Sequence, residues 1–199
     1  MTGFKGMDSV SVITAQSSST QPVLNTARLV LRPFTPEDAP LLAKLAGTHR
    51  VADTTASIPH PYSPEQAIQD IHKFNNEFPA GVGVYFAIAL RESPQTLIGC
   101  VLLKLIDRRD EQAELGYWID EAESGKGYVT EAARAVLHYG FTVLGLNRIS
   151  ACHMTRNPAS GRVLARLGMQ QEGHLRQAAK KWGVYEDLLV WAILREEFK

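Results

Sequence analysis

Hydrophobic and polar residues alternate along residues 27–34, the segments 85–92, 96–106 and 113–120 are rich in β-branched and aromatic residues, and apolar residues recur at three- and four-residue spacings along residues 126–144. Alternation with a period of two predicts strands, and the longer spacings predict helices. The expected strands cover residues 27–34, 85–92, 96–106, 113–120, 147–154, 169–179 and 184–194. The expected helices, with their capping residues, cover residues 35–47, 63–78, 126–144 and 157–168. Strands and helices do not alternate one for one, so the order predicts an α/β (α+β) fold with helices on the faces of a mixed sheet.

The length of 199 residues suits one domain with a substantial core. The first 21 residues are polar and lack a charged segment followed by an apolar stretch, so we expect a flexible tail rather than a signal peptide. Residues 22–199 are then the single folded domain. No apolar run approaches the roughly 20 residues that span a bilayer, so no membrane partner is expected.

The charge is balanced, with 21 lysines and arginines against 21 aspartates and glutamates. A nucleic-acid-binding protein would carry a basic face, so this class is not expected. Cys100 and Cys152 each lie in an apolar strand segment, and we interpret both as small buried residues. No CxxC motif or paired histidine spacing predicts a metal site, and two isolated cysteines favour a cytoplasmic location.

The segment SGKGYVTEAARAVLHYG, residues 124–140, places two glycines immediately before the longest expected helix. A helix N-terminus presents unpaired N–H groups and a partial positive charge, and glycine lets a ligand approach closely. Gly125, Lys126, Gly127 and Tyr128 therefore suit a phosphate or diphosphate. A flexible turn between a strand and a helix explains the same residues equally well. The spacing fits neither a P-loop nor a dinucleotide-binding fingerprint.

Several motifs occur in a recognisable order: TARLVLRPFTPEDA, ELGYWIDEAESGKGYVTEAARAVLHYG, NRISACHMTRNPASGRVLARLG and GVYEDLLVWAIL. Together they resemble the GNAT acetyltransferases, and more narrowly the Rim-type ribosomal-protein N-acetyltransferases and their small-molecule relatives. The resemblance covers nearly the whole chain beyond residue 22. It implies a mixed, mostly antiparallel seven-stranded sheet, acetyl-CoA as cofactor, and an amine acceptor that is a peptide N-terminus or a small molecule. Dimers are frequent among similar proteins, so the resemblance also allows a homodimer.

The diphosphate loop of this family follows the pattern R/Q-x-x-G-x-G/A, which falls on residues 124–129 here. Gly127 occupies the fixed glycine, whereas Ser124 and Val129 depart from the pattern. The missing Arg or Gln side chain matters little if backbone N–H groups make the contact. The resemblance therefore assigns cofactor binding to Gly125, Lys126, Gly127 and Tyr128.

Glu114 begins an otherwise apolar strand, on the same face as Trp118 and opposite Leu115. A carboxylate there suits a general base for the acceptor amine, and the resemblance supports that position. An exposed charge at a strand end is the alternative. In similar proteins the backbone at the positions of Tyr117, Trp118 and Ile119 pairs with the pantetheine amides. A role for Tyr117 and Trp118 as aromatic core residues is equally consistent with the sequence.

Asn157 and Ser160 begin the second of the expected C-terminal helices, where Asn157 suits an N-cap. The resemblance places both beside the cofactor, with Ser160 near its thiol end as a hydrogen-bond donor to the departing thiolate. Many GNAT enzymes carry a tyrosine later in this helix as general acid. Leu164 stands there instead, so Ser160, a water molecule or Tyr185 must substitute, or no protein acid is needed.

The resulting prediction is an acetyl-CoA-dependent N-acetyltransferase in which an amine attacks the thioester directly, in a ternary complex. Two alternatives remain: a non-catalytic module that binds acyl-CoA, and an acetyltransferase for aminoglycosides or polyamines. Trp182 and Asp187 lie near the acceptor cleft by analogy, but we interpret them as a surface aromatic residue and a hairpin charge.

Overall fold

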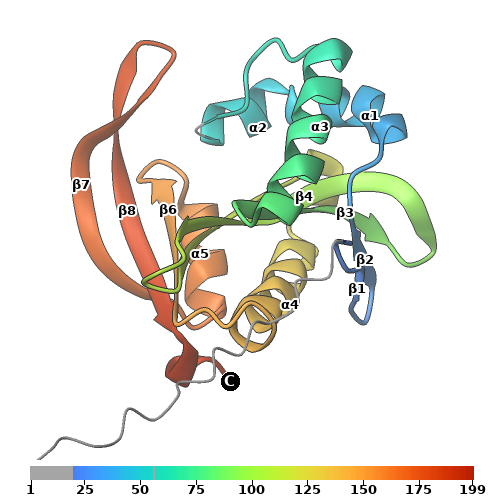
Figure 1. The fold of residues 1–199 in the computed structure, drawn as a ribbon. Helices are drawn as coiled ribbons and strands as arrows, with labels where there is room; N and C mark the ends of the chain where they lie inside the picture. Colours follow the sequence, from blue (N-terminus) through green and yellow to red (C-terminus); the bar gives the residue numbers. More distant parts are fainter. Residues whose placement is uncertain (1–19, 56) are drawn as a thin grey trace, which may run out of the picture.

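An eight-stranded sheet organises the chain, in the spatial order β1-β2-β3-β4-β5-β6-β8-β7 (Figure 1). The computed structural model describes residues 20–55 and 57–199. The strands are β1 Leu24–Asn25, β2 Leu29–Arg32, β3 Gly83–Leu90, β4 Ser93–Asp107, β5 Gln112–Ile119, β6 Arg148–Met154, β7 Gln170–Lys181 and β8 Val184–Leu194. Strands β5 and β6 pair in parallel, and the other neighbours pair antiparallel. The expected mixed, mostly antiparallel sheet is confirmed.

The strand count is eight rather than the expected seven. The additional strand, β1, has two residues, and pairs with β2 through Leu24 opposite Leu31 and Asn25 opposite Val30. Two residues are too few to show an alternating pattern, so only tertiary pairing reveals this strand. Most of the expected N-terminal tail, residues 1–19, lies outside the described residues.

The helices are η1 Pro36–Asp38, α1 Ala39–Ala46, α2 His49–Thr54, α3 Pro64–Ala80, η2 Glu121–Glu123, α4 Tyr128–Thr142, α5 Pro158–Arg166 and η3 Arg195–Glu197. Helix α2 was not expected, because six residues are too few to establish a helical repeat. Its N-cap is Thr48, whose side chain accepts a hydrogen bond from the N–H of Val51. Helix α4 is shorter than the expected 126–144, because Gly127 adopts a left-handed conformation and acts as its N-cap.

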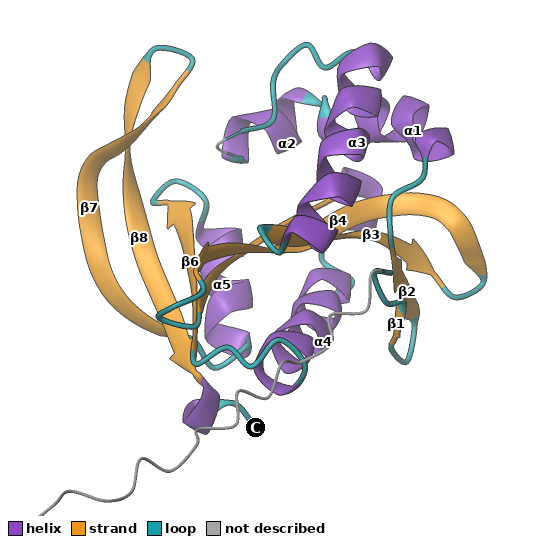
Figure 2. Cartoon of the chain, in the orientation of Figure 1, coloured by secondary structure: helices purple, strands orange, loops and turns teal. Residues whose placement is uncertain are grey.

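The sheet separates two hydrophobic clusters, each covered by helices (Figure 2). Helices α4 and α5 cover one face, where Phe86 and Leu137 are fully buried. Helices α1, α2 and α3 cover the other face, where Phe34 and Ile71 lie in the core. Burying a side chain of this size stabilises the fold by about 1.5–3 kcal/mol. Among the described residues, no helix is long and apolar enough to cross a membrane.

A buried ion pair joins β2 to the helices that follow it. Arg32 donates two hydrogen bonds to Asp38, of 2.7 and 2.8 Å, and the two side chains are 11% and 4% exposed. The backbone N–H of Thr35 also donates to Asp38, at 2.8 Å. The carboxylate is therefore satisfied by two residues, and it fixes the direction in which the chain enters η1 and α1.

Candidate active site

Strands β5 and β6 begin as neighbours and then diverge. Their parallel pairing covers Gln112 with Arg148, Ala113 with Ile149, and Glu114 with Ser150. Beyond this point β5 pairs with β4 and β6 pairs with β8, so their facing edges form no ladder within the described residues. The unpaired backbone of residues 115–119 can therefore hydrogen-bond with an extended ligand.

Glu114 lies at the last residue pair before this divergence. The alternation expected around it is confirmed, because Trp118 packs in the cluster under α1–α3, whereas Leu115 packs under α4 and α5. The thiol of Cys152 donates to Glu114 Oε1 at 3.5 Å, which brings β6 and β5 side chains together on one face. Glu114 is half-buried and lies where the two strands separate.

Cys152 is exposed, so the interpretation of both cysteines as buried is wrong for this one and holds for Cys100. The cause is the strand divergence, which leaves part of β6 uncovered. Partial desolvation, together with the charge of Glu114, raises the pKa of the Cys152 thiol to about 11. The thiol stays protonated near neutral pH and is a poor nucleophile there.

Ser160 lies in the first turn of α5, where Tyr117 reaches it from β5. The Tyr117 hydroxyl lies 2.8 Å from Ser160 Oγ, where either oxygen can donate, and 3.3 Å from the Ser160 carbonyl oxygen, which can only accept. The expected N-cap is confirmed, since Asn157 Oδ1 accepts from the N–H of Ser160 at 3.3 Å. Burial raises the pKa of the Tyr117 phenol to about 12, although the hydrogen bond with Ser160 opposes the shift. Tyr117 therefore remains protonated at physiological pH.

The glycine loop before α4 has the conformation of an anion site. Gly125 and Gly127 have φ values of 80° and 84°, in the left-handed region that favours glycine. Among the described residues, none accepts a hydrogen bond from the N–H groups of residues 125–129. A Cβ atom added at Gly125 would meet nothing within 4 Å, so the loop is open on that side. These unpaired donors at a helix N-terminus fit the diphosphate of coenzyme A.

Two cofactor candidates in this loop have partners within the chain. Lys126 Nζ donates to Glu123 at 2.9 Å, so its charge is partly balanced within the chain rather than presented alone at the rim. The ring of Tyr128 lies under the guanidinium of Arg28, at 4.5 Å from its centroid. The sequence motif alone predicts neither contact, and Arg28 was not among the expected site residues.

Helix α2 covers the face of the sheet that carries Glu114. Val51 of this helix is buried in the same cluster as Trp118. Arg50 forms an exposed ion pair with Glu121, which follows β5. One end of the unexpected helix is thereby attached to the β5 side of the divergence.

Further contacts attach α2 to the β6 side. Arg156, which follows β6, binds both Asp53 of α2 and Glu186 of β8. Trp182 at the tip of the β7–β8 hairpin packs against His49, with ring centroids 4.6 Å apart. Trp182 is half exposed, as a surface aromatic residue should be, but it also connects the hairpin to α2. These contacts join residues far apart in the chain, so local patterns do not reveal them.

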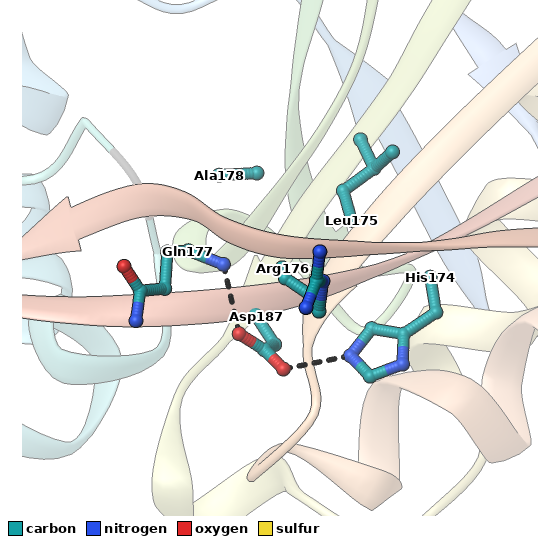
Figure 3. Close-up of a pocket in the computed structure, with 6 residues that line it drawn as sticks. All are labelled: His174, Leu175, Arg176, Gln177, Ala178 and Asp187. Carbon is teal, nitrogen blue, oxygen red and sulfur yellow. Dashed lines mark hydrogen bonds and ion pairs between the residues drawn. The ribbon is translucent and has the colours of Figure 1, made fainter.

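A cavity of about 790 Å³ lies on the β7–β8 hairpin, and Figure 3 shows Asp187 between His174 and Gln177. Asp187 accepts from the N–H of Gln177 and from His174 Nε2, each at 2.8 Å. The first of these bonds, and then the second, hold the pKa of the Asp187 carboxyl below its ordinary value. Gln177 has a positive φ of 52°, so Asp187 supports the irregular part of the hairpin.

Comparisons with known proteins agree on one family. Residues 28–170 match the family profile described as acetyltransferase (GNAT) domain. The chain is 33% identical over 174 residues to the uncharacterized N-acetyltransferase YoaA of Bacillus subtilis (strain 168), covering 87% of this chain and 97% of that protein. It is 28% identical over 183 residues to the ribosomal protein uS5-alanine N-acetyltransferase of Escherichia coli (strain K12), covering 85% and 89%. The structure of Mycobacterium smegmatis RimJ in complex with CoA-disulfide aligns with a TM-score of 0.78 at 25% identity, covering 85% and 83%.

Proposed function

The chain belongs to the GNAT acetyltransferase family and is an acetyl-CoA-dependent N-acetyltransferase, and we propose that its acceptor is the N-terminal α-amine of a protein. The name of the Escherichia coli relative, which acts on an alanine of a ribosomal protein, supports this acceptor class. A cytoplasmic location is part of the proposal, and the two free thiols support it.

The observation that carries the catalytic part of the proposal is the position of Glu114 at the point where β5 and β6 separate. An extended thioester that hydrogen-bonds to the free edge of β5 would bring its acetyl group close to this carboxylate. The open N–H groups of Gly125 and Gly127 would hold the diphosphate at the other end of the same ligand. A single bound molecule accounts for both features.

Acetyl-CoA supplies an acetyl group that is activated as a thioester. Glu114 takes the proton that the attacking amine must lose, directly or through one water molecule. A backbone N–H of residues 117–119 stabilises the negative charge that develops on the acetyl oxygen. Direct attack needs no enzyme nucleophile, in keeping with the raised pKa of Cys152.

Ser160 and Tyr117 act together at the departing sulfur in this proposal. When the single Tyr117 hydroxyl proton is donated to Ser160 Oγ rather than to the Ser160 carbonyl, the Ser160 hydroxyl proton is free to point toward the thiolate. The phenol stays protonated over the physiological pH range, so this proton remains available to Ser160 Oγ. This pair replaces the tyrosine that many GNAT enzymes carry where Leu164 stands here.

The acceptor can be tested by measuring thiol release from acetyl-CoA with a panel of amines. We expect turnover with peptides that carry a free N-terminal alanine or serine, and none with the same peptides after N-terminal blocking. A polyamine and an aminoglycoside form the second arm. Faster turnover with either of these would reject the protein N-terminus as acceptor, and binding of acetyl-CoA without turnover on any amine would favour the non-catalytic module.

Removing the Tyr117 hydroxyl is expected to lower kcat modestly. Ser160→Ala should reduce kcat by roughly 10- to 100-fold, within the range of a proton donor or a hydrogen bond to a developing charge. Tyr117→Phe should cost less, about 3- to 10-fold, since it only orients Ser160. Steady-state kinetics of both variants and of the double variant check this. If the two losses multiply in the double variant, the residues act independently and the relay is wrong.

A further inference from the structure

We infer that Arg28, in the turn between β1 and β2, positions the loop that holds the cofactor diphosphate. This inference rests on the proposed function, because the diphosphate site belongs to it. Arg28 lies 98 residues from Lys126 in the chain, yet its Nη1 donates to the Lys126 carbonyl at 3.0 Å. The β1–β2 turn therefore packs against the glycine loop.

The hydrogen bond to Lys126 determines where the next N–H points. The peptide group between Lys126 and Gly127 is planar and trans, so its C=O and N–H point in opposite directions. By holding the carbonyl, Arg28 directs the Gly127 N–H away from the guanidinium. A glycine at this position rotates freely unless it is held, so the contact pre-organises a donor for the ligand.

Arg28 also balances a negative charge that would oppose a diphosphate. Glu131 lies in the first turn of α4 and accepts hydrogen bonds from Arg28 Nε at 2.7 Å, Arg28 N at 2.8 Å and Thr26 Oγ1 at 2.6 Å. Burial alone would raise the pKa of this carboxyl, but these hydrogen bonds and the guanidinium charge hold the pKa below its ordinary value. Glu131 is thus ionised beside an anion site, and Arg28 neutralises it.

Two further contacts place the guanidinium against the loop itself. It lies over the Tyr128 ring at 4.5 Å from the centroid. A Cβ atom added at Gly127 would lie 3.5 Å from Arg28 Nη2. One side chain therefore contacts Lys126 and Tyr128 on either side of Gly127, together with Glu131 in the first turn of the helix. Lysine cannot reproduce this set, because its ammonium lacks the planar fork.

A comparison of two acetyl donors tests the inference. S-acetyl-pantetheine carries the reacting thioester and lacks the diphosphate, so it reports on folding and chemistry without the glycine loop. For Arg28→Met we expect kcat/KM with acetyl-CoA to fall roughly tenfold, the effect of losing a charge-assisted hydrogen bond. With S-acetyl-pantetheine the expected change is less than about twofold. Arg28→Lys should also lose most of the preference for acetyl-CoA over S-acetyl-pantetheine.

Arg148→Met is the matched control, because Arg148 forms an exposed pair with Glu172 away from the loop. It should leave the ratio of the two donors unchanged. The inference would be overturned if Arg28→Met lost kcat/KM equally with both donors, or if it kept the wild-type kcat/KM with both. Full recovery in Arg28→Lys would also overturn it, because charge alone would then suffice. If wild-type protein does not prefer acetyl-CoA over S-acetyl-pantetheine, the diphosphate site itself is wrong and the inference fails with it.

Discussion

Glu114→Gln is expected to lower kcat by roughly 10²- to 10⁴-fold at pH 7, the range for loss of a general base. The amide keeps the size and polarity of the side chain but takes up no proton. The affinity for acetyl-CoA should change little, because the proposed contacts to the cofactor are made by backbone groups of β5 and the glycine loop. Steady-state kinetics and calorimetric titration with coenzyme A measure the two quantities separately.

The pH dependence of this variant gives a second check. An N-terminal α-amine has an ordinary pKa of about 7.7–8.0, so its neutral fraction rises steeply between pH 7 and 9. The deficit of Glu114→Gln should therefore shrink as pH rises, because the acceptor arrives already deprotonated. Cys152→Ala, on the neighbouring strand at 3.5 Å, is the control and should keep near-normal activity. An active Glu114→Gln or an inactive Cys152→Ala contradicts the mechanism.

Arg32→Met is expected to reduce the free energy of unfolding by about 3–5 kcal/mol, the cost of leaving a buried charge without its partner. Asp38 is only 4% exposed at its side chain and would keep just the N–H of Thr35 as donor. Urea titration followed by circular dichroism measures the loss. The methionine retains the apolar length of the arginine side chain, so the change reports mainly on the guanidinium.

Arg148→Met again supplies the control, here for stability. The side chains of Arg148 and Glu172 are 27% and 43% exposed, and pairs of this kind contribute about 0–1 kcal/mol. A loss of less than about 1 kcal/mol for Arg32→Met would mean that Asp38 finds another partner or becomes neutral. Adding Asp38→Asn to Arg32→Met should recover part of the stability, since no buried charge then remains.

The motifs of the sequence were sufficient for the family and most of the fold. The resemblance to GNAT acetyltransferases is confirmed, as are the mixed sheet and the alternation around Glu114. Such features depend on local periodicity or on a glycine next to a helix, which a sequence displays directly. Strand β1 and helix α2 were missed, since elements of two and six residues are too short to show a period.

The side-chain contacts of the site required the structure. Tyr117 was expected to contribute its backbone, yet its hydroxyl contacts Ser160, 43 residues later. Arg28 and Glu131 are separated by 103 residues and each resembles an ordinary surface charge in the sequence. Cys152 follows an apolar strand pattern but is exposed, because the strand leaves its neighbour at that point. In each case, packing between segments far apart in the sequence determines the contact or the exposure, and the local pattern does not reveal it.

The short ladder between β5 and β6 has a mechanical consequence. Three residue pairs join two half-sheets, β1–β5 and β6–β8, that are otherwise each continuous. A ligand that hydrogen-bonds along the free edge of β5 and also contacts α5 would connect the two half-sheets where they share no ladder. At a concentration 100 times its Kd, such a ligand adds about 2.7 kcal/mol of resistance to unfolding. The enzyme saturated with acetyl-CoA should therefore be more rigid, and unfold at a higher temperature, than the ligand-free protein.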